Sequence, residues 1–367
     1  MINLNHKRYV NSPYLRYIKE ENNHIAYNFL DNNIHIINKD DKNILDYCKT
    51  PRTLEELSNL YNIKRINQMI VNRFLLLDDH IWDQESVTNL EIETSTMCNW
   101  ACNYCPASFY KRTPQKIEMD LYKYILDKAY EFGKIKTVSI QSYNEPSIDN
   151  RFFEYIKEIK QHGFRLVLYT NGSNLTNDKI ELLKKMQVLD RIIFNLPAVD
   201  KDIFREITNN DNVERTLNSI RLAIDCGFEV IISVQGKHLY KDSEVEKMKI
   251  LFDKAKIEPF ISIDRAGILK NEYHQNINIK NKLLTGCITF SNTIHITVNG
   301  DLYICCNDYF RNYIYANIKN NNFKDVFNSD SYIELRKKIF GGLAVEEEFI
   351  CKHCSIMENS LSFRKVE

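Results

Sequence analysis

The chain has 367 residues, and its 49 Lys and Arg balance its 49 Asp and Glu, giving a formal net charge of +0. This balance argues against a general nucleic-acid binder, which needs a basic excess. A hydrophobic content of 44% can build the cores of two or three domains. The sequence carries neither an apolar run long enough for a transmembrane helix nor a signal peptide, so we expect a cytoplasmic protein without nucleic-acid or membrane partners.

Residues 1–88 predict a small, separate domain with a winged-helix-like layout. It begins with three short extended runs that Asn- and Asp-rich turns separate: Tyr14–Ile18, His24–Phe29 and Ile34–Ile37. Three helical patterns follow, over Lys39–Cys48, from an N-cap at Thr53 with Glu56 as its capping-box partner, and over residues 64–76.

Residues 89–270 alternate strands and helices. The six candidate strands are Leu90–Thr96, Thr137–Gln141, Arg165–Tyr169, Arg191–Asn195, Glu229–Val234 and Phe260–Ile263. The helices between them include Leu121–Phe132, Phe152–His162, Lys179–Gln187, Val213–Asp225 and Val245–Lys254, three of which end at Gly133, Gly163 or Gly227. Six βα units predict a parallel sheet but are too few to close an eight-stranded barrel. The expected fold class is therefore α/β, with an open, partial (β/α)6 barrel.

Residues 271–367 break this alternation and predict a third domain. Asn299-Gly300 lies between the extended runs Thr293–Val298 and Asp301–Ile304, which indicates a hairpin with a two-residue loop. A helix is expected over Ser331–Phe340.

The ten cysteines suggest metal binding, because a reducing cytosol disfavours disulfides. Cys98, Cys102 and Cys105 form a CX3CX2C motif in the loop after the first barrel strand, where parallel barrels place their active sites. Three thiolates can hold a [4Fe–4S] cluster and leave one iron open to an exogenous ligand. A zinc site completed by a distant ligand is the alternative.

A second cysteine group lies near the C-terminus and consists of Cys287, Cys305, Cys351 and Cys354. Four thiolates complete either a [4Fe–4S] cluster or a tetrahedral zinc site, and their spacing leaves both open. Cys306 is then a buried small residue, a ligand in place of Cys305, or a hydrogen-atom donor. Cys48 and Cys226 lie on predicted helices and are expected to be packing residues.

The CX3CX2C motif, with Tyr104 just before its third cysteine, resembles that of the radical S-adenosylmethionine (SAM) superfamily, and the resemblance covers residues 90–366. It implies that the open iron chelates SAM, which is cleaved to a 5′-deoxyadenosyl radical that abstracts a hydrogen atom from the substrate. A flavodoxin or ferredoxin would supply the electron.

The same resemblance implies a set of SAM-binding residues: Tyr104, Asn144, Glu145, Thr170, Asn195, Arg205 and Arg265. Asn144-Glu145 stands where the family has Gly-Glu, so Glu145 is expected to contact the SAM amino group and Asn144 to offer its backbone carbonyl. Thr170 belongs to a segment that lines the SAM cleft, and Asn195 meets the ribose or carboxylate. Arg205 either pairs with the carboxylate or is a surface arginine.

The outer segments also resemble known modules. Residues 271–367 resemble the SPASM domain in its shortened twitch form, which implies one auxiliary [4Fe–4S] cluster held by Cys287, Cys305, Cys351 and Cys354, and two [4Fe–4S] clusters in all. Residues 1–88 resemble the PqqD-like recognition elements that bind the leader of a ribosomally made, post-translationally modified precursor peptide (RiPP). Such elements take up an extended peptide along a strand edge; a scaffold that only packs on the core or binds a partner protein is the alternative.

Three functions follow from these resemblances. The first is a radical SAM enzyme that epimerises, crosslinks or oxidises a precursor peptide. The second is a radical SAM oxidoreductase acting on a carbohydrate or aminocyclitol. The third is a non-catalytic metal-binding scaffold. The presence of Glu145 together with a three-cysteine site argues against this third function.

Overall fold

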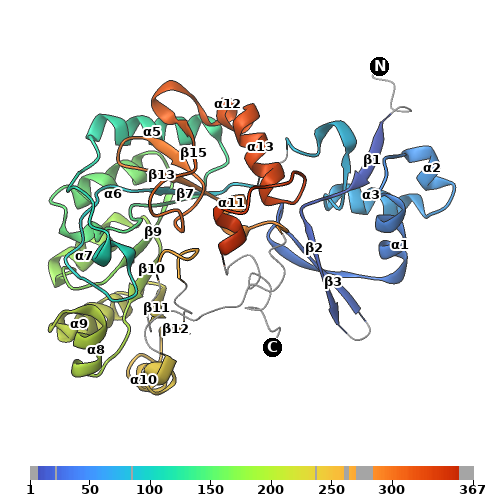
Figure 1. Ribbon diagram of the computed structural model, residues 1–367. Helices are drawn as coiled ribbons and strands as arrows, with labels where there is room; N and C mark the ends of the chain where they lie inside the picture. The colour runs from blue at the N-terminus through green and yellow to red at the C-terminus, as the bar shows by residue number, and fades with distance from the viewer. Residues whose placement is uncertain are drawn as a thin grey trace. The chain divides into compact units, whose positions relative to one another are not determined.

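The computed structural model describes residues 7–20, 23–83, 86–235, 238–259, 264–269 and 284–354 (Figure 1). The chain forms two compact units, each assembled from separate stretches of sequence. The first comprises Met1–Ser86, Ile279–Asn292 and Asp325–Glu367, and the second comprises Val87–Asn278 and Thr293–Lys324.

The first unit begins with the predicted meander and three helices. Strands β2 (Leu15–Glu20), β3 (Asn23–Asn28) and β4 (Asn33–Ile37) form an antiparallel sheet with β3 in the middle. Helices α1 (Lys39–Tyr47), α2 (Leu54–Ser58) and α3 (Ile63–Val71) follow. The predicted capping box of Thr53 and Glu56 opens α2, and a second one at Asn38 opens α1.

The sequence did not reveal a second small sheet in this unit. It has the order β5-β1-β6 and consists of β1 (Arg8–Asn11), β5 (Arg52–Thr53) and β6 (Leu75–Leu77). The third helix was predicted five residues too long, because the chain turns at Arg73, whose φ is 58°, and residues 75–77 enter this sheet. A short helix, η2 (Asp78–His80), follows β6.

The C-terminal stretches of the first unit are helical. They contain α11 (Ile288–Asn292), α13 (Asp330–Ile339) and η5 (Ile350–His353), while α12 (Phe323–Phe327) begins in the second unit. Phe340, at the end of α13, packs edge-on against Tyr14 with 4.5 Å between ring centroids. The predicted helix over residues 331–340 is thus confirmed, and it belongs to the same core as the N-terminal strands.

The second unit contains the predicted partial barrel. Six parallel strands lie in chain order from the centre of a sheet to its edge: β7 (Asn89–Ile92), β8 (Thr137–Ser139), β9 (Arg165–Thr170), β10 (Leu189–Asn195), β11 (Val230–Val234) and β12 (Lys256–Pro259). The predicted strand Phe260–Ile263 lies outside the described residues, and β12 pairs with β11 just before it.

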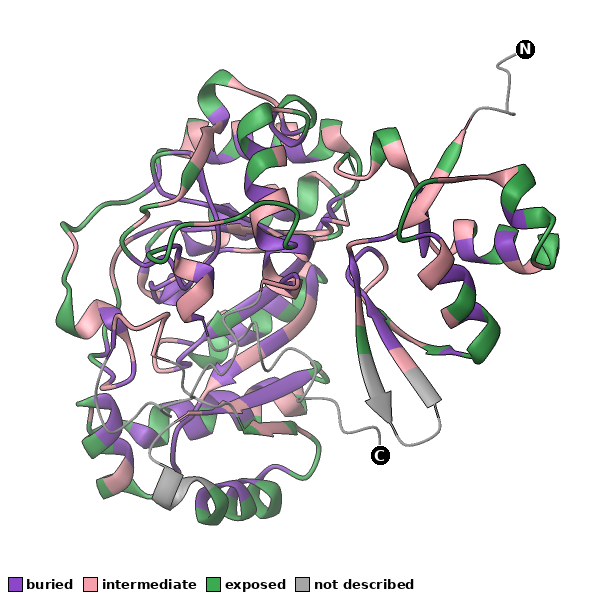
Figure 2. Cartoon of the chain, turned by 45° about the vertical axis from the view of Figure 1, so that its right-hand side comes forward, coloured by how far each residue is buried: buried purple, intermediate pink, exposed green. Residues whose placement is uncertain are grey.

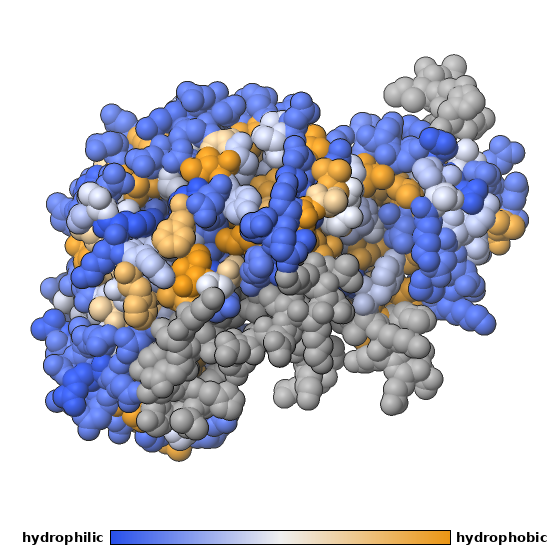
Figure 3. Space-filling model, viewed as in Figure 1, coloured by the Kyte–Doolittle hydropathy of each residue, from blue (hydrophilic) through white to orange (hydrophobic). Residues whose placement is uncertain are grey.

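The helices of this unit connect the parallel strands. They are α4 (Pro106–Phe109), α5 (Met119–Phe132), η3 (Pro146–Ile148), α6 (Phe152–Gln161), α7 (Asn177–Met186), α8 (Lys201–Thr208), α9 (Val213–Asp225) and α10 (His238–Leu251). Their buried faces turn towards the sheet and their exposed faces turn outwards (Figure 2). Accordingly, the face of the molecule in Figure 3 is largely hydrophilic over the helices of this unit. No helix in the described part of the chain is long and apolar enough to span a membrane.

The barrel sheet continues into the C-terminal part of the sequence. Strand β13 (Thr293–Ile296) pairs in parallel with β7, and β14 (Asp301–Tyr303) and β15 (Ile314–Asn317) extend the sheet to nine strands. A short helix, η4 (Ile318–Asn320), follows β15. The predicted hairpin is present, but its loop has three residues, because Thr297 N donates to the Asp301 carbonyl at 3.0 Å. Within that loop Gly300 adopts a φ of 88° and Asn299 a negative φ, whereas the two-residue type I′ turn needs positive φ at both positions.

The two faces of the sheet differ in chemistry, and this difference positions the site. On β7 the side chains of Leu90 and Ile92 are fully buried on the helix side, whereas Glu91 lies on the other face. In the sheet register Glu91 is flanked by Ser139 of β8 and His295 of β13. The inner face of the barrel is therefore polar at its centre.

Candidate active site

The CX3CX2C loop follows β7 and is fixed by the end of α8. Asn103 N donates to the Ile207 carbonyl at 2.8 Å, and the side-chain amide of Asn209 donates to the Ala101 carbonyl at 2.7 Å. Trp100 packs edge-on against Phe204 of α8, with 5.1 Å between ring centroids. The end of α8 thus holds the middle of the loop, and within the loop Cys98 Sγ accepts a hydrogen bond from Trp100 N at 3.5 Å.

The three thiols share one desolvated environment. Burial raises the pKa of Cys98 to about 12 and also raises the pKa of Cys102 and Cys105, and the negative charge of neighbouring thiolates raises the first two further. Cys98 nevertheless remains exposed to solvent. Thiols that resist ionisation in this way become ligands when a metal supplies the compensating positive charge.

Within the described residues, no three Cys, His, Asp or Glu side chains gather around a single metal-ion position. A [4Fe–4S] cluster makes a different demand, because each cysteine binds a different iron. The three cysteines of this loop are candidates to meet this demand.

Glu145 is buried beside this loop at the C-terminal ends of β8 and β9. Its Oε1 accepts hydrogen bonds from the Thr170 hydroxyl at 2.7 Å and the Ser147 hydroxyl at 2.5 Å, and its Oε2 accepts one from Asn171 N at 2.7 Å. Burial raises the pKa of Glu145, although these hydrogen bonds oppose the rise. Its backbone N donates to the carbonyl of Met97, the residue before Cys98, at 2.9 Å, and its charge raises the pKa of Cys98 beyond the effect of burial.

Asn144 holds the turn that carries Glu145. Its side-chain amide donates to the Thr94 hydroxyl at 3.2 Å and the Ile140 carbonyl at 3.3 Å, and its Oδ1 accepts from Ser142 N at 2.9 Å. Asn144 is not among the residues with positive φ, so its backbone does not require glycine at this position.

Several buried polar atoms in this region have no hydrogen-bond partner within the described residues. They include Oδ1 of Asn195, Oε1 of Gln141 and Nε of Arg265. The other side-chain atom of Asn195 donates to the Tyr104 hydroxyl, which orients the unpartnered oxygen. Unsatisfied buried polar atoms are costly, so their grouping here fits a polar ligand such as SAM.

Arg265 and Cys306 meet on the inner side of the barrel. Arg265 Nη1 lies 3.9 Å from Cys306 Sγ and 3.1 Å from Asn307 Oδ1, and Arg265 has a φ of 53°, in the left-handed region that disfavours side chains. Tyr169, at the end of β9, is 41% exposed, yet burial raises its pKa to about 12, and the negative charges of Glu91 and Cys306 raise it further. A side chain that is both desolvated and accessible lies on an interior surface.

Arg205 does not join this group. It is 54% exposed on α8 and forms ion pairs with Asp202 at 2.8 Å and Asp211 at 3.6 Å. The structure therefore favours the surface interpretation of Arg205 over a contact with the SAM carboxylate, because two carboxylates already hold the guanidinium.

The second cysteine group is divided between the two units. Cys287, Cys351 and Cys354 are buried in the first unit, and Cys305 is buried in the second, next to the partly exposed Cys306. All ten cysteines lie in the described ranges, and none forms a disulfide. The assignment of the four auxiliary ligands stays a prediction.

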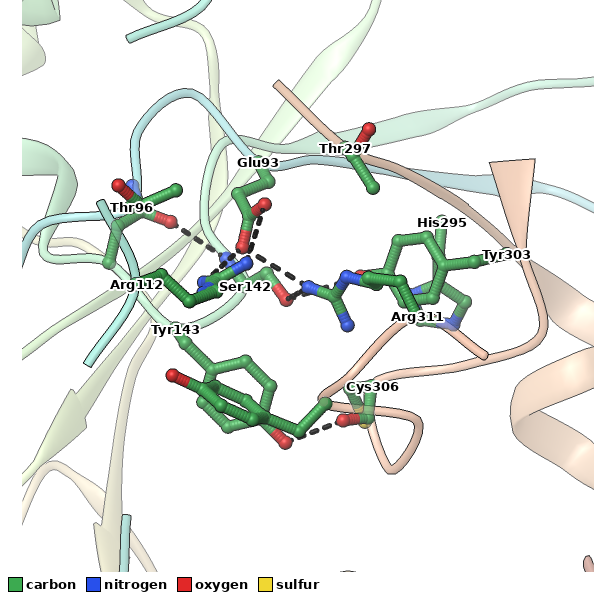
Figure 4. A network of polar contacts seen from close by, with 12 residues as sticks. Glu93, Thr96, Arg112, Ser142, Tyr143, His295, Thr297, Tyr303, Cys306 and Arg311 are labelled. Atoms are coloured by element: carbon green, nitrogen blue, oxygen red, sulfur yellow. Dashed lines mark hydrogen bonds and ion pairs between the residues drawn. The ribbon is translucent and has the colours of Figure 1, made fainter. Parts of the chain in front are cut away.

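The sequence analysis missed a polar network on the inner face of the barrel (Figure 4). Its centre is Glu93, only 1% exposed, which pairs with Arg112 at 2.7 Å and with Arg311 at 3.1 Å. Nearby, His295 Nδ1 lies 3.1 Å from Glu91. The spacing of Glu91 and Glu93, which places two carboxylates on one face of a strand, was the available signal.

Comparisons with known proteins agree with this geometry. Residues 92–249 match the Radical SAM superfamily, and residues 287–355 match the SPASM iron–sulfur cluster-binding domain. The chain thus carries the domains of a radical SAM enzyme with an auxiliary iron–sulfur domain. These domains imply SAM and a [4Fe–4S] cluster in the barrel and auxiliary iron–sulfur binding in the C-terminal segment.

Individual relatives are distant. The chain is 24% identical to the S-adenosyl-L-methionine-dependent 2-deoxy-scyllo-inosamine dehydrogenase of Niallia circulans over 270 residues, which are 72% of this chain and 92% of that protein. It is 30% identical to the tungsten-containing aldehyde ferredoxin oxidoreductase cofactor-modifying protein of Pyrococcus furiosus over 110 residues, which are 30% of this chain and 31% of that protein.

Among solved structures, Streptococcus suis SuiB bound to S-adenosylmethionine has the same fold. The TM-score is 0.55 at 14% sequence identity, and the match covers 89% of this chain and 90% of SuiB. At this identity the similarity establishes the architecture only.

Proposed function

We propose that this protein is a radical SAM enzyme that modifies a ribosomally made precursor peptide. The observation that carries the proposal is an apolar strand edge that has no partner strand within the described residues, in a small N-terminal module that precedes a three-cysteine barrel site. Bound SAM would supply the radical that removes a hydrogen atom from the peptide.

The unpaired strand edge belongs to β4, which bonds only to β3 within the described sheet. Ile36, on this strand, is 72% exposed, and its neighbour across the sheet is Ile25. Natural proteins normally protect an apolar edge strand with charges or a covering segment. An extended leader peptide would add a strand at this edge through main-chain hydrogen bonds and cover the apolar side chain.

A structure of SuiB with its precursor peptide SuiA has the same fold as this chain, with a TM-score of 0.52 and 13% sequence identity. SuiB is therefore an example of a protein with this fold that binds a peptide. The peptide partner of this chain is inferred from its own strand edge.

In the barrel, this chain's residues would bind and orient the reactants. Cys98, Cys102 and Cys105 would hold the cluster, and Glu145, fixed by Thr170 and Asn171, would accept the SAM ammonium group. The unpartnered Oδ1 of Asn195 would accept a ribose hydroxyl. Cys306, which contacts Arg265 on the inner side, would donate a hydrogen atom to a peptide radical if the outcome is epimerisation.

The decisive experiment first searches beside the gene for a short reading frame, and its product is then made as a fluorescent peptide. We expect it to bind the full chain and to be modified in a reaction that also yields 5′-deoxyadenosine, with a mass change in the peptide. Ile36→Asp should weaken binding at least tenfold, because it places a charge against the docked peptide.

A matched control is available in Ile250→Asp, since Ile250 is 82% exposed on α10 of the other unit. This variant should bind the peptide like the wild type. Equal binding by the Ile36 and Ile250 variants would refute the docking edge, and 5′-deoxyadenosine formation without any peptide modification would refute the peptide substrate.

An oxidoreductase acting on an aminocyclitol is the second candidate, favoured by the relative from Niallia circulans, which the chain matches over 92% of its length. The polar inner face, with Glu91, Ser139 and Tyr169, also suits a polyhydroxylated substrate. Incubation with 2-deoxy-scyllo-inosamine under reducing conditions would separate the two functions, because only this second candidate predicts its oxidation.

A further inference from the structure

The segment that carries Cys305 and Cys306 is bound to the barrel by a buried ion-pair network. We call residues 304–313, between β14 and β15, the cysteine-pair loop. Inside the loop, the Asp308 carboxylate accepts from Asn312 N at 2.9 Å and Tyr313 N at 2.8 Å, and Arg311 has a φ of 60°. These hydrogen bonds fix the turn of the loop and thereby the direction in which the Arg311 side chain points.

Arg311 projects towards Glu93, which directly follows β7. Its Nη2 lies 3.1 Å from Glu93 Oε1 and 3.3 Å from the Ser142 hydroxyl, and its guanidinium stacks 3.8 Å above the Tyr303 ring (Figure 4). These contacts join the cysteine-pair loop to β7 and to the connection after β8.

The same carboxylate holds the segment that follows the CX3CX2C loop. Arg112 donates two hydrogen bonds to the Glu93 carboxylate, from Nη1 to Oε2 at 3.1 Å and from Nη2 to Oε1 at 2.7 Å. This is the bidentate geometry of strong guanidinium–carboxylate pairs. Glu93 therefore bonds both to the cysteine-pair loop and to the segment that follows the CX3CX2C loop.

Two further contacts support this connection. The Tyr143 hydroxyl donates to the Cys306 carbonyl, and the Tyr309 hydroxyl donates to the Tyr110 carbonyl. Every bond in the set lies within one compact unit. A carboxylate that is 1% exposed and paired with two guanidiniums costs a great deal to disrupt, because the remaining charges lose their compensation.

We propose that Glu93 is a positioning residue that clamps the CX3CX2C loop and the cysteine-pair loop together through Arg112 and Arg311. The clamp fixes Cys306 relative to the three cluster cysteines, so that a substrate radical formed at one side meets the cysteine-pair loop at the other. This role rests on the proposed radical chemistry, but the mechanical connection itself does not.

The test compares Glu93→Gln and Arg311→Lys with a matched control. Arg311→Lys keeps the charge but loses the fork that reaches Glu93 and Ser142 together. The control is Asp149→Asn, because Asp149 is also a buried carboxylate that pairs with two cations, Lys116 at 3.1 Å and Arg151 at 3.3 Å, and none of the three belongs to the CX3CX2C loop or the cysteine-pair loop.

Hydrogen exchange of the full chain, with and without reconstituted clusters, measures directly how firmly the clamp holds the cysteine-pair loop. We expect at least tenfold faster exchange at residues 304–313 in both clamp variants, and faster exchange only around residues 146–151 in the control. Unchanged exchange at residues 304–313 in both variants, or the same increase there in the control, would overturn the proposal.

The ratio of 5′-deoxyadenosine to modified peptide measures how the clamp affects the coupling of SAM cleavage to peptide modification. Both clamp variants should cleave SAM with severalfold less modified peptide per cleavage, at an iron content near that of the wild type, and the control should keep the wild-type ratio. If no peptide is modified by any form, the proposed substrate is wrong, and hydrogen exchange still decides the clamp.

Discussion

The Thr170 hydroxyl donates a hydrogen bond to Glu145 Oε1 at 2.7 Å, joining the ends of two neighbouring parallel strands. Asn171 N donates to the other carboxylate oxygen at the same distance. The strand β9 thereby aims the carboxylate at a position beside Cys98, where a cationic ligand group would find a negative charge already held in place.

Replacing Glu145 by Gln should therefore weaken SAM binding. The substitution keeps the shape but removes the charge, and hydrogen bonds to charged groups contribute about 1.5–3 kcal/mol, so we expect about 10- to 100-fold weaker affinity. Anaerobic calorimetry of the reconstituted protein measures it. Glu244→Gln is the control, because Glu244 is also a buried carboxylate with backbone donors, at Val199 and Asp200. Equal affinity in both variants would exclude the ammonium contact.

Replacing Cys98, Cys102 and Cys105 together by Ala should remove one cluster. Reconstituted wild-type protein is expected to bind about eight iron atoms per chain and the triple variant about four, since each cluster holds four irons. Iron and sulfide assays, with the visible absorption of the clusters, check the numbers. Zinc instead of iron in protein purified without oxygen would contradict the cluster assignment.

Replacing Cys305 and replacing Cys306 should have different effects on iron content and product formation. Cys305 is buried while Cys306 is partly exposed and contacts Arg265. Cys305→Ala is therefore expected to reduce the iron content towards about four per chain. Cys306→Ala should keep all of its iron and lose product formation if the thiol donates a hydrogen atom. The reverse pattern of iron loss would make Cys306 the ligand.

Gly172 and Gly133 form a matched pair for stability, because both have a φ of +73°. A Cβ on Gly172 would lie 2.8 Å from the Phe194 ring, whereas a Cβ on Gly133 meets nothing within 4 Å. Gly133→Ala should cost about 1 kcal/mol in the free energy of unfolding, from backbone strain. Gly172→Ala should cost about 1–3 kcal/mol more, from overpacking. Urea denaturation measures both, and equal costs would show that the ring yields without penalty.

Cys48 should make the first unit less stable in alkali. Burial raises the pKa of its thiol from 9.0 to about 11. The folded state therefore keeps the thiol protonated, whereas the unfolded chain ionises it above about pH 9. The contribution of the thiol to the free energy of unfolding is complete below pH 9 and is lost as the pH rises from 9 to about 11. The loss amounts to about 3 kcal/mol.

Cys48→Ala should flatten this pH dependence, although its cavity lowers stability at every pH. Urea denaturation at several values between pH 8 and 11, compared between the two proteins, isolates the thiol. Parallel curves for the wild type and the variant would show that the thiol does not titrate as its burial requires.

Local sequence patterns predicted the elements well where they depend on neighbours in the chain. The capping box of Thr53 and Glu56, and the glycines that end three barrel helices with positive φ, required only short-range geometry. The loop of the hairpin was predicted one residue too short, because Asn-Gly also fits a three-residue loop in which only the glycine has positive φ.

The site was predictable to the extent that its residues belong to one segment. The cysteine loop and Glu145 could be found from motif and strand order, whereas the ion pairs of Glu93 join residues up to 218 positions apart. Such a network depends on which strands become neighbours, and the pairing of β13 with β7 is not visible in a local pattern. Arg205 shows the opposite case, since Asp202 and Asp211 hold it at the surface.

The position of β7 has a practical consequence for studying the two iron–sulfur segments separately. Because β7 bonds to β8 on one side and to β13 on the other, a chain shortened before residue 293 would leave one side of β7 without hydrogen-bond partners. Leu90 and Ile92, fully buried in the intact sheet, would lie at that open edge. Such an edge pairs readily with other chains, so the isolated barrel should self-associate, and mutations in the intact chain are the better means of separating the two cluster sites.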